Sequence, residues 1–157
     1  MNWQNWLFWG IMATLAQITF EAATQGLRLT RMSLPYMLGT MFTANRSKAK
    51  VLGFVSHIAN GLLFALIYIV AFHYWGGPTW WRGAVIGLAQ ASFVLLVGMP
   101  LLPEIHPRMA TERYGPVAMR QLEPPGFLAL NYGPKTPISI VLSHVIFGCV
   151  IGSFCRA

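Results

Sequence analysis

Four long runs of apolar residues alternate with polar, proline-containing stretches along this chain. The runs cover roughly residues 6–27, 51–74, 83–102 and 137–154. Each is close to the ~20 helical residues that cross a hydrocarbon core of about 30 Å. A soluble helical bundle would need charged outer faces on these segments, and they have none. The pattern therefore predicts an all-α membrane protein with four transmembrane helices, forming a single integral membrane domain over residues 1–157.

The two halves of the chain resemble each other. Residues 10–20 (GIMATLAQITF) match residues 83–93 (GAVIGLAQASF) at an offset of 73, and Ser56-His57 matches Ser143-His144 at an offset of 87. The first match lies in the opening apolar segment of each half and the second in the closing segment. We therefore expect a tandem-duplicated two-helix hairpin, with repeat 1 at about residues 3–75 and repeat 2 at about residues 76–157.

The two connections inside the expected hairpins are not simple linkers. Residues 31–42 contain Leu34-Pro35-Tyr36-Met37-Leu38, which is too short to span a bilayer and too apolar to lie in water. We expect an interfacial or re-entrant segment there. Residues 103–136 hold six of the ten prolines, which excludes a long regular helix. The apolar residues of this second loop predict that it lies against the membrane or caps the bundle.

Composition and charge add an orientation. Hydrophobic residues make up 55% of the chain and charged residues 10%, with a mean hydropathy of +0.54, unlike an ordinary soluble domain. Of the 11 Lys and Arg residues, all but Arg82 and Arg156 fall in the two long loops. Basic residues mark cytoplasmic loops, so both loops are expected in the cytoplasm and both termini on the non-cytoplasmic side of the cell inner (plasma) membrane.

The tryptophans and the net charge fit the same orientation. The six tryptophans lie at positions 3, 6, 9, 75, 80 and 81, which all map to the outer interface. The formal net charge of +7 then reflects topology. It does not indicate a nucleic-acid partner, because no soluble basic module exists to bind one. The expected partners are the lipid bilayer and, as alternatives, other membrane subunits or a second copy in a homo-oligomer.

Polar residues inside the apolar segments fall on single helical faces. The spacing of Gly10, Thr14, Gln17, Glu21, Thr24 and Arg28 puts them on one side of the first helix. Glycines at four-residue spacing share a face with polar residues in the other segments, and such faces let membrane helices approach closely. We expect these faces to meet inside the bundle. The residues on them are Gly53, His57, Asn60 and Gly61, then Gly83, Gly87, Gln90 and Ala91, then His144, Gly148 and Gly152.

Three ionisable side chains are expected at one depth. Glu21, His57 and His144 each lie seven residues inside the cytoplasmic boundary, which is about 10 Å along a helix. An ionised carboxylate alone at that depth is costly, so Glu21 should be protonated, paired with a histidine or bound to a cation. Glu104 and His106, at the cytoplasmic mouth of the third segment, are candidates to extend this layer.

Several functions fit such a layer. Glu21, His57 and His144, with Glu104 and His106 as further ligands, suit a Zn, Fe or Mn site. His57 and His144 could instead ligate haem b from two sides. Glu21 could carry protons in a transporter, by analogy with small multidrug transporters, whose loops are shorter. Finally, the polar residues could only hydrogen-bond one helix to another.

We expect a small inner-membrane protein that binds or handles a cation, either a metal or protons, at this layer. The alternatives are a non-catalytic accessory or scaffold subunit of a larger membrane complex, and a bis-histidine haem protein. Whether the chain is an enzyme stays open. It contains no aspartate, no glycine-rich phosphate loop, no Cys-x-x-Cys and no Gly-x-Ser-x-Gly.

Overall fold

The computed structural model describes residues 2–111, 115–120 and 122–155, and this part of the chain is helical without any strand, as predicted. The short connections between the long helices carry helices of their own. In chain order the elements are α1 (Trp3–Gly26), α2 (Leu34–Thr40), α3 (Arg46–Tyr74), α4 (Trp80–Phe93), the π-helical turn η1 (Val94–Gly98), α5 (Met99–Ile105), the 3₁₀ segment η2 (Phe127–Tyr132) and α6 (Thr136–Phe154).

Three of the helices are long and apolar enough to cross a membrane. They are Arg46–Tyr74, the continuous stretch Trp80–Ile105 and Thr136–Phe154. The first helix, α1, has 24 residues but carries Gln17, Glu21 and several threonines, which lower its hydropathy. The chain therefore has the helices of a membrane protein, while a fourth crossing by α1 stays a prediction.

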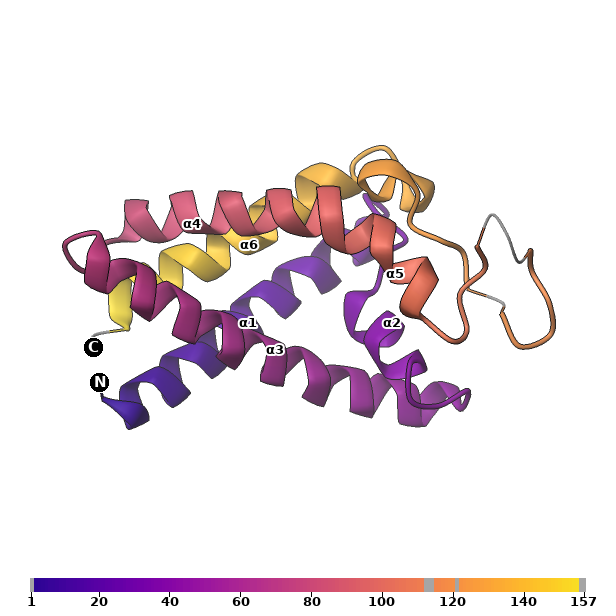
Figure 1. Cartoon of the computed structure of the whole chain (residues 1–157), viewed down its shortest axis with the longest axis horizontal. Coiled ribbons are helices and arrows are strands. Elements are labelled where there is room, and N and C mark those ends of the chain that lie inside the picture. Colours follow the sequence, from indigo (N-terminus) through magenta and orange to yellow (C-terminus); the bar gives the residue numbers. More distant parts are fainter. Residues whose placement is uncertain (1, 112–114, 121, 156–157) are drawn as a thin grey trace.

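The long helices lie side by side along the long axis of the molecule (Figure 1). Both termini lie at one end, and α2, α5 and η2 gather at the other. The most extensive packing is between α4 and α6, and α1 packs against both α6 and α3. By contrast, α3 and α4 follow each other in the chain but have few contacts. The bundle is thus open between α3 and α4 and closed on its other sides.

Glycines bring α4 and α6 into backbone contact. A Cβ atom placed on Gly83 would lie 1.9 Å from the carbonyl oxygen of Gly148, and one on Gly148 would lie 2.0 Å from that of Gly83. In α3, a Cβ on Gly61 would lie 1.9 Å from Oγ1 of Thr14 in α1. The glycine faces expected from the sequence therefore do meet inside the bundle.

The short apolar segment after α1 forms α2, which packs on the first turns of α3. A Cβ on Gly39 would lie 1.7 Å from the carbonyl oxygen of Ala49, and one on Gly53 would lie 1.6 Å from that of Pro35. Pro35 stands in the first turn of α2, where its missing N–H has no helical partner to lose. Consequently α2 is held against α3 by backbone contact, and its interfacial or re-entrant position in the membrane stays a prediction.

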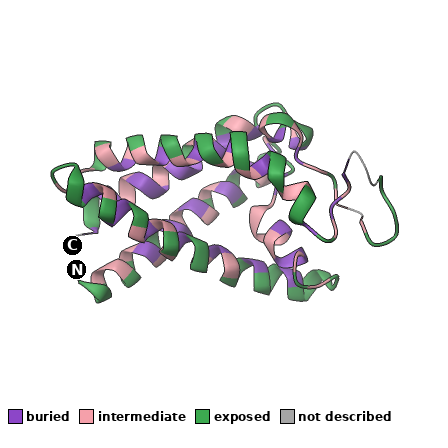
Figure 2. Cartoon of the chain, in the orientation of Figure 1, coloured by how far each residue is buried: buried purple, intermediate pink, exposed green. Residues whose placement is uncertain are grey.

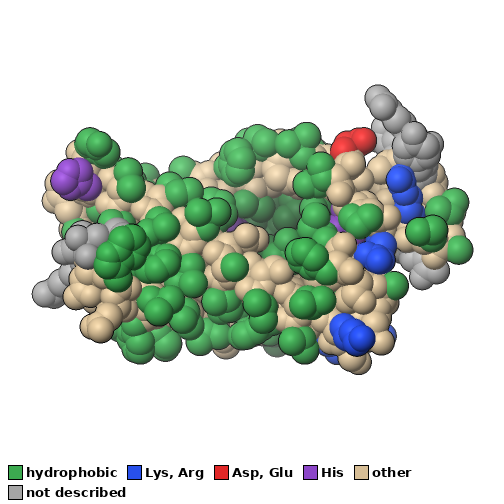
Figure 3. All heavy atoms as spheres, turned by 60° about the horizontal axis from the view of Figure 1, so that its bottom comes forward, with side chains coloured by type: hydrophobic (Ala, Val, Ile, Leu, Met, Phe, Trp, Pro, Cys, Tyr) green, Lys and Arg blue, Asp and Glu red, His purple; other side chains and the backbone are tan. Residues whose placement is uncertain are grey.

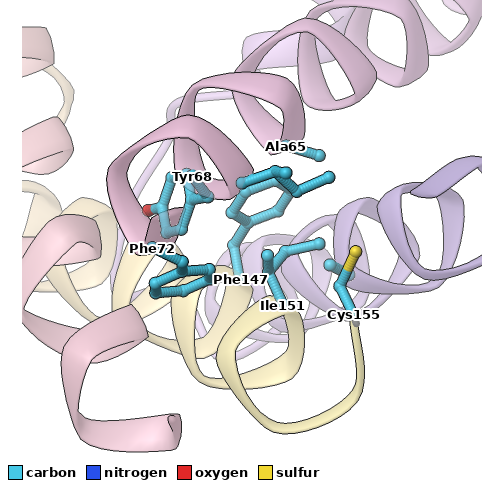
Figure 4. Close-up of a cluster of buried hydrophobic side chains, with 8 residues drawn as sticks. Ala65, Tyr68, Phe72, Phe147, Ile151 and Cys155 are labelled. Carbon is cyan, nitrogen blue, oxygen red and sulfur yellow. The ribbon is translucent and has the colours of Figure 1, made fainter. Parts of the chain in front are cut away.

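Buried side chains face the inside of the bundle and exposed ones face outward (Figure 2). The core around Tyr68 is aromatic: the centroids of the Tyr68 and Phe147 rings lie 5.4 Å apart, and the two rings meet edge to face (Figure 4). Large apolar side chains cover the outer surface instead of charges, and Leu63, Ile67 and Ile138 are each more than half exposed. Such a surface is suited to hydrocarbon and not to water.

The two ends of the bundle differ in chemistry. At the end with the termini, Trp9 stacks on Phe154 at 4.5 Å, and the Arg82 guanidinium lies 5.1 Å from the Trp81 ring. Lys and Arg side chains gather at the opposite end (Figure 3). Arg113 and Arg156, which also entered the topology prediction, lie outside the described residues. The aromatic residues at one end and the basic residues at the other agree with the two membrane interfaces expected from the sequence. Which end faces the cytoplasm stays a prediction.

The helix of the third apolar segment runs further than the sequence predicted. We expected it to end at residue 102, but it continues as α5 to Ile105 and contains Pro100 and Pro103. The π-helical turn Val94–Gly98 comes directly before α5. Such a wider turn relieves the clash between a proline ring and the preceding carbonyl groups, so the helix bends there and continues.

The long second loop caps the end of the bundle, one of the two placements expected. Met109 is fully buried among Met37, Met99 and Tyr132. Arg31 anchors the loop through an ion pair with Glu123 at 3.2 Å, and its backbone N–H donates to the carbonyl oxygen of Tyr132 at 2.8 Å. As predicted, the described part of this loop holds no long helix, and its only helical segment is η2.

Candidate functional site

A cavity of about 240 Å³ lies inside the bundle and opens between α3 and α4. A hollow with histidine side chains in its floor is visible on this apolar face of the molecule (Figure 3). Every helix contributes to the wall, and the five polar side chains come from four different helices. The lining residues are Gln17, Leu34, Leu38, His57, Asn60, Gly61, Phe64, Gln90, Val94, Gly98, Met99, Leu102, His144 and Phe147.

The cavity brings His57 and His144 together. Both side chains are buried, and each lies on the glycine-bearing face of its helix, α3 for His57 and α6 for His144. In His144, Nδ1 lies 2.8 Å from the carbonyl oxygen of Ile140. A carbonyl oxygen only accepts, so Nδ1 donates and the neutral ring presents Nε2 as an acceptor. In His57, Nδ1 is buried without a hydrogen-bond partner among the described residues.

Glu21 lies behind the wall of the cavity. Its carboxyl group is buried, and Oε1 accepts a hydrogen bond of 3.2 Å from the amide of Gln17, one turn earlier in α1. The other oxygen, Oε2, has no partner of normal geometry in the described part of the chain, although the Ser143 hydroxyl of α6 is a neighbour. Gln17 itself lines the cavity, so it connects the carboxyl group to the open space.

Ser143 ties the carboxyl group to the histidines. Its hydroxyl donates to the carbonyl oxygen of Ile140 at 2.9 Å and lies 3.3 Å from Nδ1 of His144. Gln17, Glu21, Ser143 and His144 thus form a polar path from α1 to α6, in which Glu21 and Ser143 are neighbours without a hydrogen bond of normal geometry. The path runs through a region whose other side chains are apolar, where each polar contact is strengthened by the low dielectric.

Tyr68 lies beside the cavity and was not among the residues predicted from the sequence. Its hydroxyl donates to Oε1 of Gln90 at 2.8 Å, which joins α3 to α4 at the tryptophan side of the cavity. The signal was present, because Tyr68 lies eleven residues after His57 and four after Phe64, on the same helical face. An aromatic residue in an apolar run gave no reason to single it out.

Glu104 and His106 do not reach this cavity. In His106, Nε2 lies 3.0 Å from the carbonyl oxygen of Met37, and Nδ1 accepts the backbone N–H of Arg108 at 3.1 Å. Both ring nitrogens are therefore used in holding the end of α5 against α2. Glu104 is exposed and borders a separate hollow with Phe127 and Asn131.

The described residues contain no group of three or more His, Cys, Asp or Glu side chains placed to hold a metal ion. The five candidate ligands are thus divided: two histidines line the cavity, Glu21 lies behind its wall, and Glu104 and His106 lie outside it. Protein sites for Zn use three or four such ligands. The cavity offers two.

Comparisons with known proteins add no family to this geometry. No protein-family model, no curated protein and no solved structure matches the chain. Its function has to follow from the chemistry of the cavity side chains.

Proposed function

We propose that this chain is a small inner-membrane protein that binds and releases protons at the layer formed by Glu21, His57 and His144. The observation that carries the proposal is a carboxyl group and two imidazoles buried around one cavity, two of them with an unpaired polar atom. Ionisable side chains in a membrane interior are costly, and they commonly mark proton or ion pathways. Purely structural hydrogen bonds between helices rarely leave such atoms unpaired.

Protons fit this layer better than a metal ion. Only two histidine side chains line the cavity, and the carboxyl group of Glu21 is engaged by Gln17 behind the wall. A proton needs only one acceptor at a time, and it can pass between the Glu21 carboxyl group, the Ser143 hydroxyl and the imidazoles without a fixed coordination geometry. These groups are neighbours along the polar path described above.

The proposed membrane arrangement has four crossing helices, α1, α3, α4 and α6, with both termini on the non-cytoplasmic side. Support comes from the two termini lying at one end (Figure 1), from the tryptophan contacts with Phe154 and Arg82 at that end, and from the Lys and Arg side chains at the opposite end (Figure 3). The proposed hairpin repeat has support in the glycine contacts. A Cβ on Gly10 would meet Ala65, and one on Gly83 would meet Gly152, which is the repeat equivalent of Ala65.

Ring-nitrogen NMR of histidine-labelled protein in lipid nanodiscs tests the proton site. If this layer exchanges protons, the ¹⁵N shifts of His57 and His144 should change over the same pH range. Glu21→Gln should alter that pH dependence while the protein stays folded. Glu104→Gln is the matched control, since Glu104 is exposed outside the cavity, and should leave it unaltered. Histidine signals that keep one form at every pH, whatever residue 21 is, would contradict the proposal.

Metal analysis and an absorption spectrum of the same purified protein separate the remaining alternatives. We expect neither stoichiometric metal nor a Soret band. Stoichiometric Zn, Fe or Mn that is lost in His57→Ala would replace the proton site by a metal site. A Soret band would establish a bis-histidine haem. If the histidine NMR signals do not respond to pH, no metal is found and no Soret band appears, the accessory-subunit alternative remains.

A further inference from the structure

We infer that the cavity binds an uncharged amphiphile that enters from the bilayer, namely a hydrocarbon carrying one hydroxyl group. The hydroxyl would hydrogen-bond at the two histidines while the hydrocarbon extends out between α3 and α4. The inference rests on the proposed function for its site and names the class of molecule that would occupy the cavity beside the proton-binding groups. Four features of the cavity support it.

The entrance faces hydrocarbon and not water. The cavity opens where α3 and α4 separate, and the long outer surface there is apolar, with Leu63 and Leu96 each more than half exposed. Leu34 and Leu38, one turn apart on α2, form the wall of the cavity toward the end of the bundle where the Lys and Arg side chains gather. A molecule dissolved in the bilayer could therefore slide in sideways without crossing a polar surface.

The polar groups of the cavity have unused hydrogen-bonding capacity. Nδ1 of His57 has no partner among the described residues, and Nε2 of neutral His144 has an acceptor lone pair. A buried polar atom without a partner costs roughly 1–3 kcal/mol. A hydroxyl group in the cavity can donate to Nε2 of His144. It would reach Nδ1 of His57, which is closed off from the cavity surface, only after that ring rotates.

The ligand should be uncharged. The residues that line the cavity include no Lys, Arg, Asp or Glu, so an ionised headgroup would find no counter-charge in it. Burying an unpaired charge costs far more than burying a hydroxyl that is hydrogen-bonded. An anionic phospholipid headgroup or a fatty-acid carboxylate would therefore be buried in the cavity without a counter-charge.

The volume fits a polar head and not a whole lipid. A cavity of about 240 Å³ corresponds to roughly eight water molecules at ~30 Å³ each. That space accepts a hydroxyl-bearing head of a few carbon atoms or a single ring. The rest of the hydrocarbon would lie in the opening and in the bilayer.

Gly98 provides a way to close the cavity. It lines the space in a helical conformation (φ −63°, ψ −48°), and a Cβ added there meets nothing within 4 Å. Gly98→Leu should fill the cavity without disturbing the backbone. Gly26→Leu is the matched control, because a Cβ at that exposed helical glycine also meets nothing within 4 Å and lies away from the cavity.

Decanol, decane and decanoate, added to the histidine-labelled protein in nanodiscs, test the inference. Decanol should shift the ring-nitrogen signals of His57 and His144 with saturation, whereas decane and decanoate should not. Gly98→Leu should weaken the decanol response at least tenfold, and Gly26→Leu should keep it. If Gly98→Leu fails to fold, Val94→Phe, which narrows the same cavity, takes its place.

Equal responses to decane and decanol, or an unchanged response in both filled variants, would overturn the inference as simple partition into the nanodisc. A response to decanoate alone would overturn the uncharged class. A saturable decanol response that both filled variants weaken, with no pH dependence of the histidines, would support the binding site and remove the proton function. The two proposals therefore fail separately.

Discussion

Nearly all buried polar side chains in the described part of this protein hydrogen-bond to a nearby carbonyl group or to a neighbouring side chain. Thr14, for example, donates to the carbonyl oxygen of Gly10 at 2.7 Å, which is a usual way for a hydroxyl to be satisfied inside a helix. Among the described residues, the buried side-chain nitrogen and oxygen atoms without partners are Oε2 of Glu21, Nδ1 of His57 and Nε of Arg82. Two of these three atoms belong to the proposed proton site, so unused polarity is concentrated there.

Alkaline pH should test how the second loop is anchored at Tyr132. Burial, with Glu123 as a further cause, raises the pKa of Tyr132 to about 12, against an ordinary value near 10. The raised value means that the neutral hydroxyl stabilises the fold fully below about pH 10 and that this contribution is lost between about pH 10 and pH 12. Tyr132→Phe also removes the hydrogen bond to the backbone carbonyl oxygen of Glu123.

The measurement is thermal unfolding of wild type and Tyr132→Phe across that pH range. The stability gap between the two proteins should be constant up to about pH 10 and then close as the pH approaches about 12. A gap that stays constant to the highest pH would show that Tyr132 does not titrate with unfolding.

At the scale of elements, glycine contacts set the distances between helices. Between α4 and α6, Gly83 and Gly148 place two backbones in contact, and between α2 and α3, Gly39 and Gly53 do the same. These contacts hold α4 against α6 and α2 against α3. Because α1 packs against both α6 and α3, the side between α3 and α4 is the one that remains open.

Gly83→Ala should break the contact between α4 and α6. The added Cβ would lie 1.9 Å from the carbonyl oxygen of Gly148, so the helices must separate. Overpacking of this kind typically costs ~1–3 kcal/mol. Gly98→Ala is the matched control: it places a Cβ in open space and should stabilise the helix by roughly 0.5–1 kcal/mol. Equal thermal stability of the two variants would contradict this packing.

The sequence predicted several of these elements but could not predict the cavity. Apolar length and four-residue glycine spacing were enough to place the long helices and the buried faces of Gly83 and Gly148. The repeat implied two equivalent helix pairs, whereas α1 packs on α6 and α3 stays apart from α4. That asymmetry depends on side-chain volumes across several helices, which no local pattern carries.

The candidate site was likewise predictable only where a local sequence pattern determines it. Helical spacing put Glu21, His57 and His144 at one depth, and both histidines do line one cavity. Spacing could not show that α5 extends through Pro103, which turns His106 toward Met37 and leaves Glu104 exposed. Proline in a helix is an exception that depends on the π-helical turn before it.

At the scale of the whole molecule, the two ends are chemically distinct and both termini lie at the tryptophan end. Basic residues at the opposite end predict that this end faces the cytoplasm. A reporter that is active only outside the cytoplasm should therefore work when fused after residue 157. The same reporter fused to a chain ending at Asn45, before α3, should be inactive. The reverse pattern would invert the topology.

The central claim is that the carboxyl group of Glu21 takes up and releases protons inside the bilayer. Infrared difference spectroscopy of the reconstituted protein during a pH change measures this directly, through the carbonyl stretch of a protonated carboxylic acid. We expect a reversible band that is lost in Glu21→Gln, kept in Glu104→Gln and shifted in Ser143→Ala, because Ser143 neighbours the carboxyl group. A spectrum in which Glu21→Gln changes no pH-dependent carboxyl band would rule out proton exchange at Glu21.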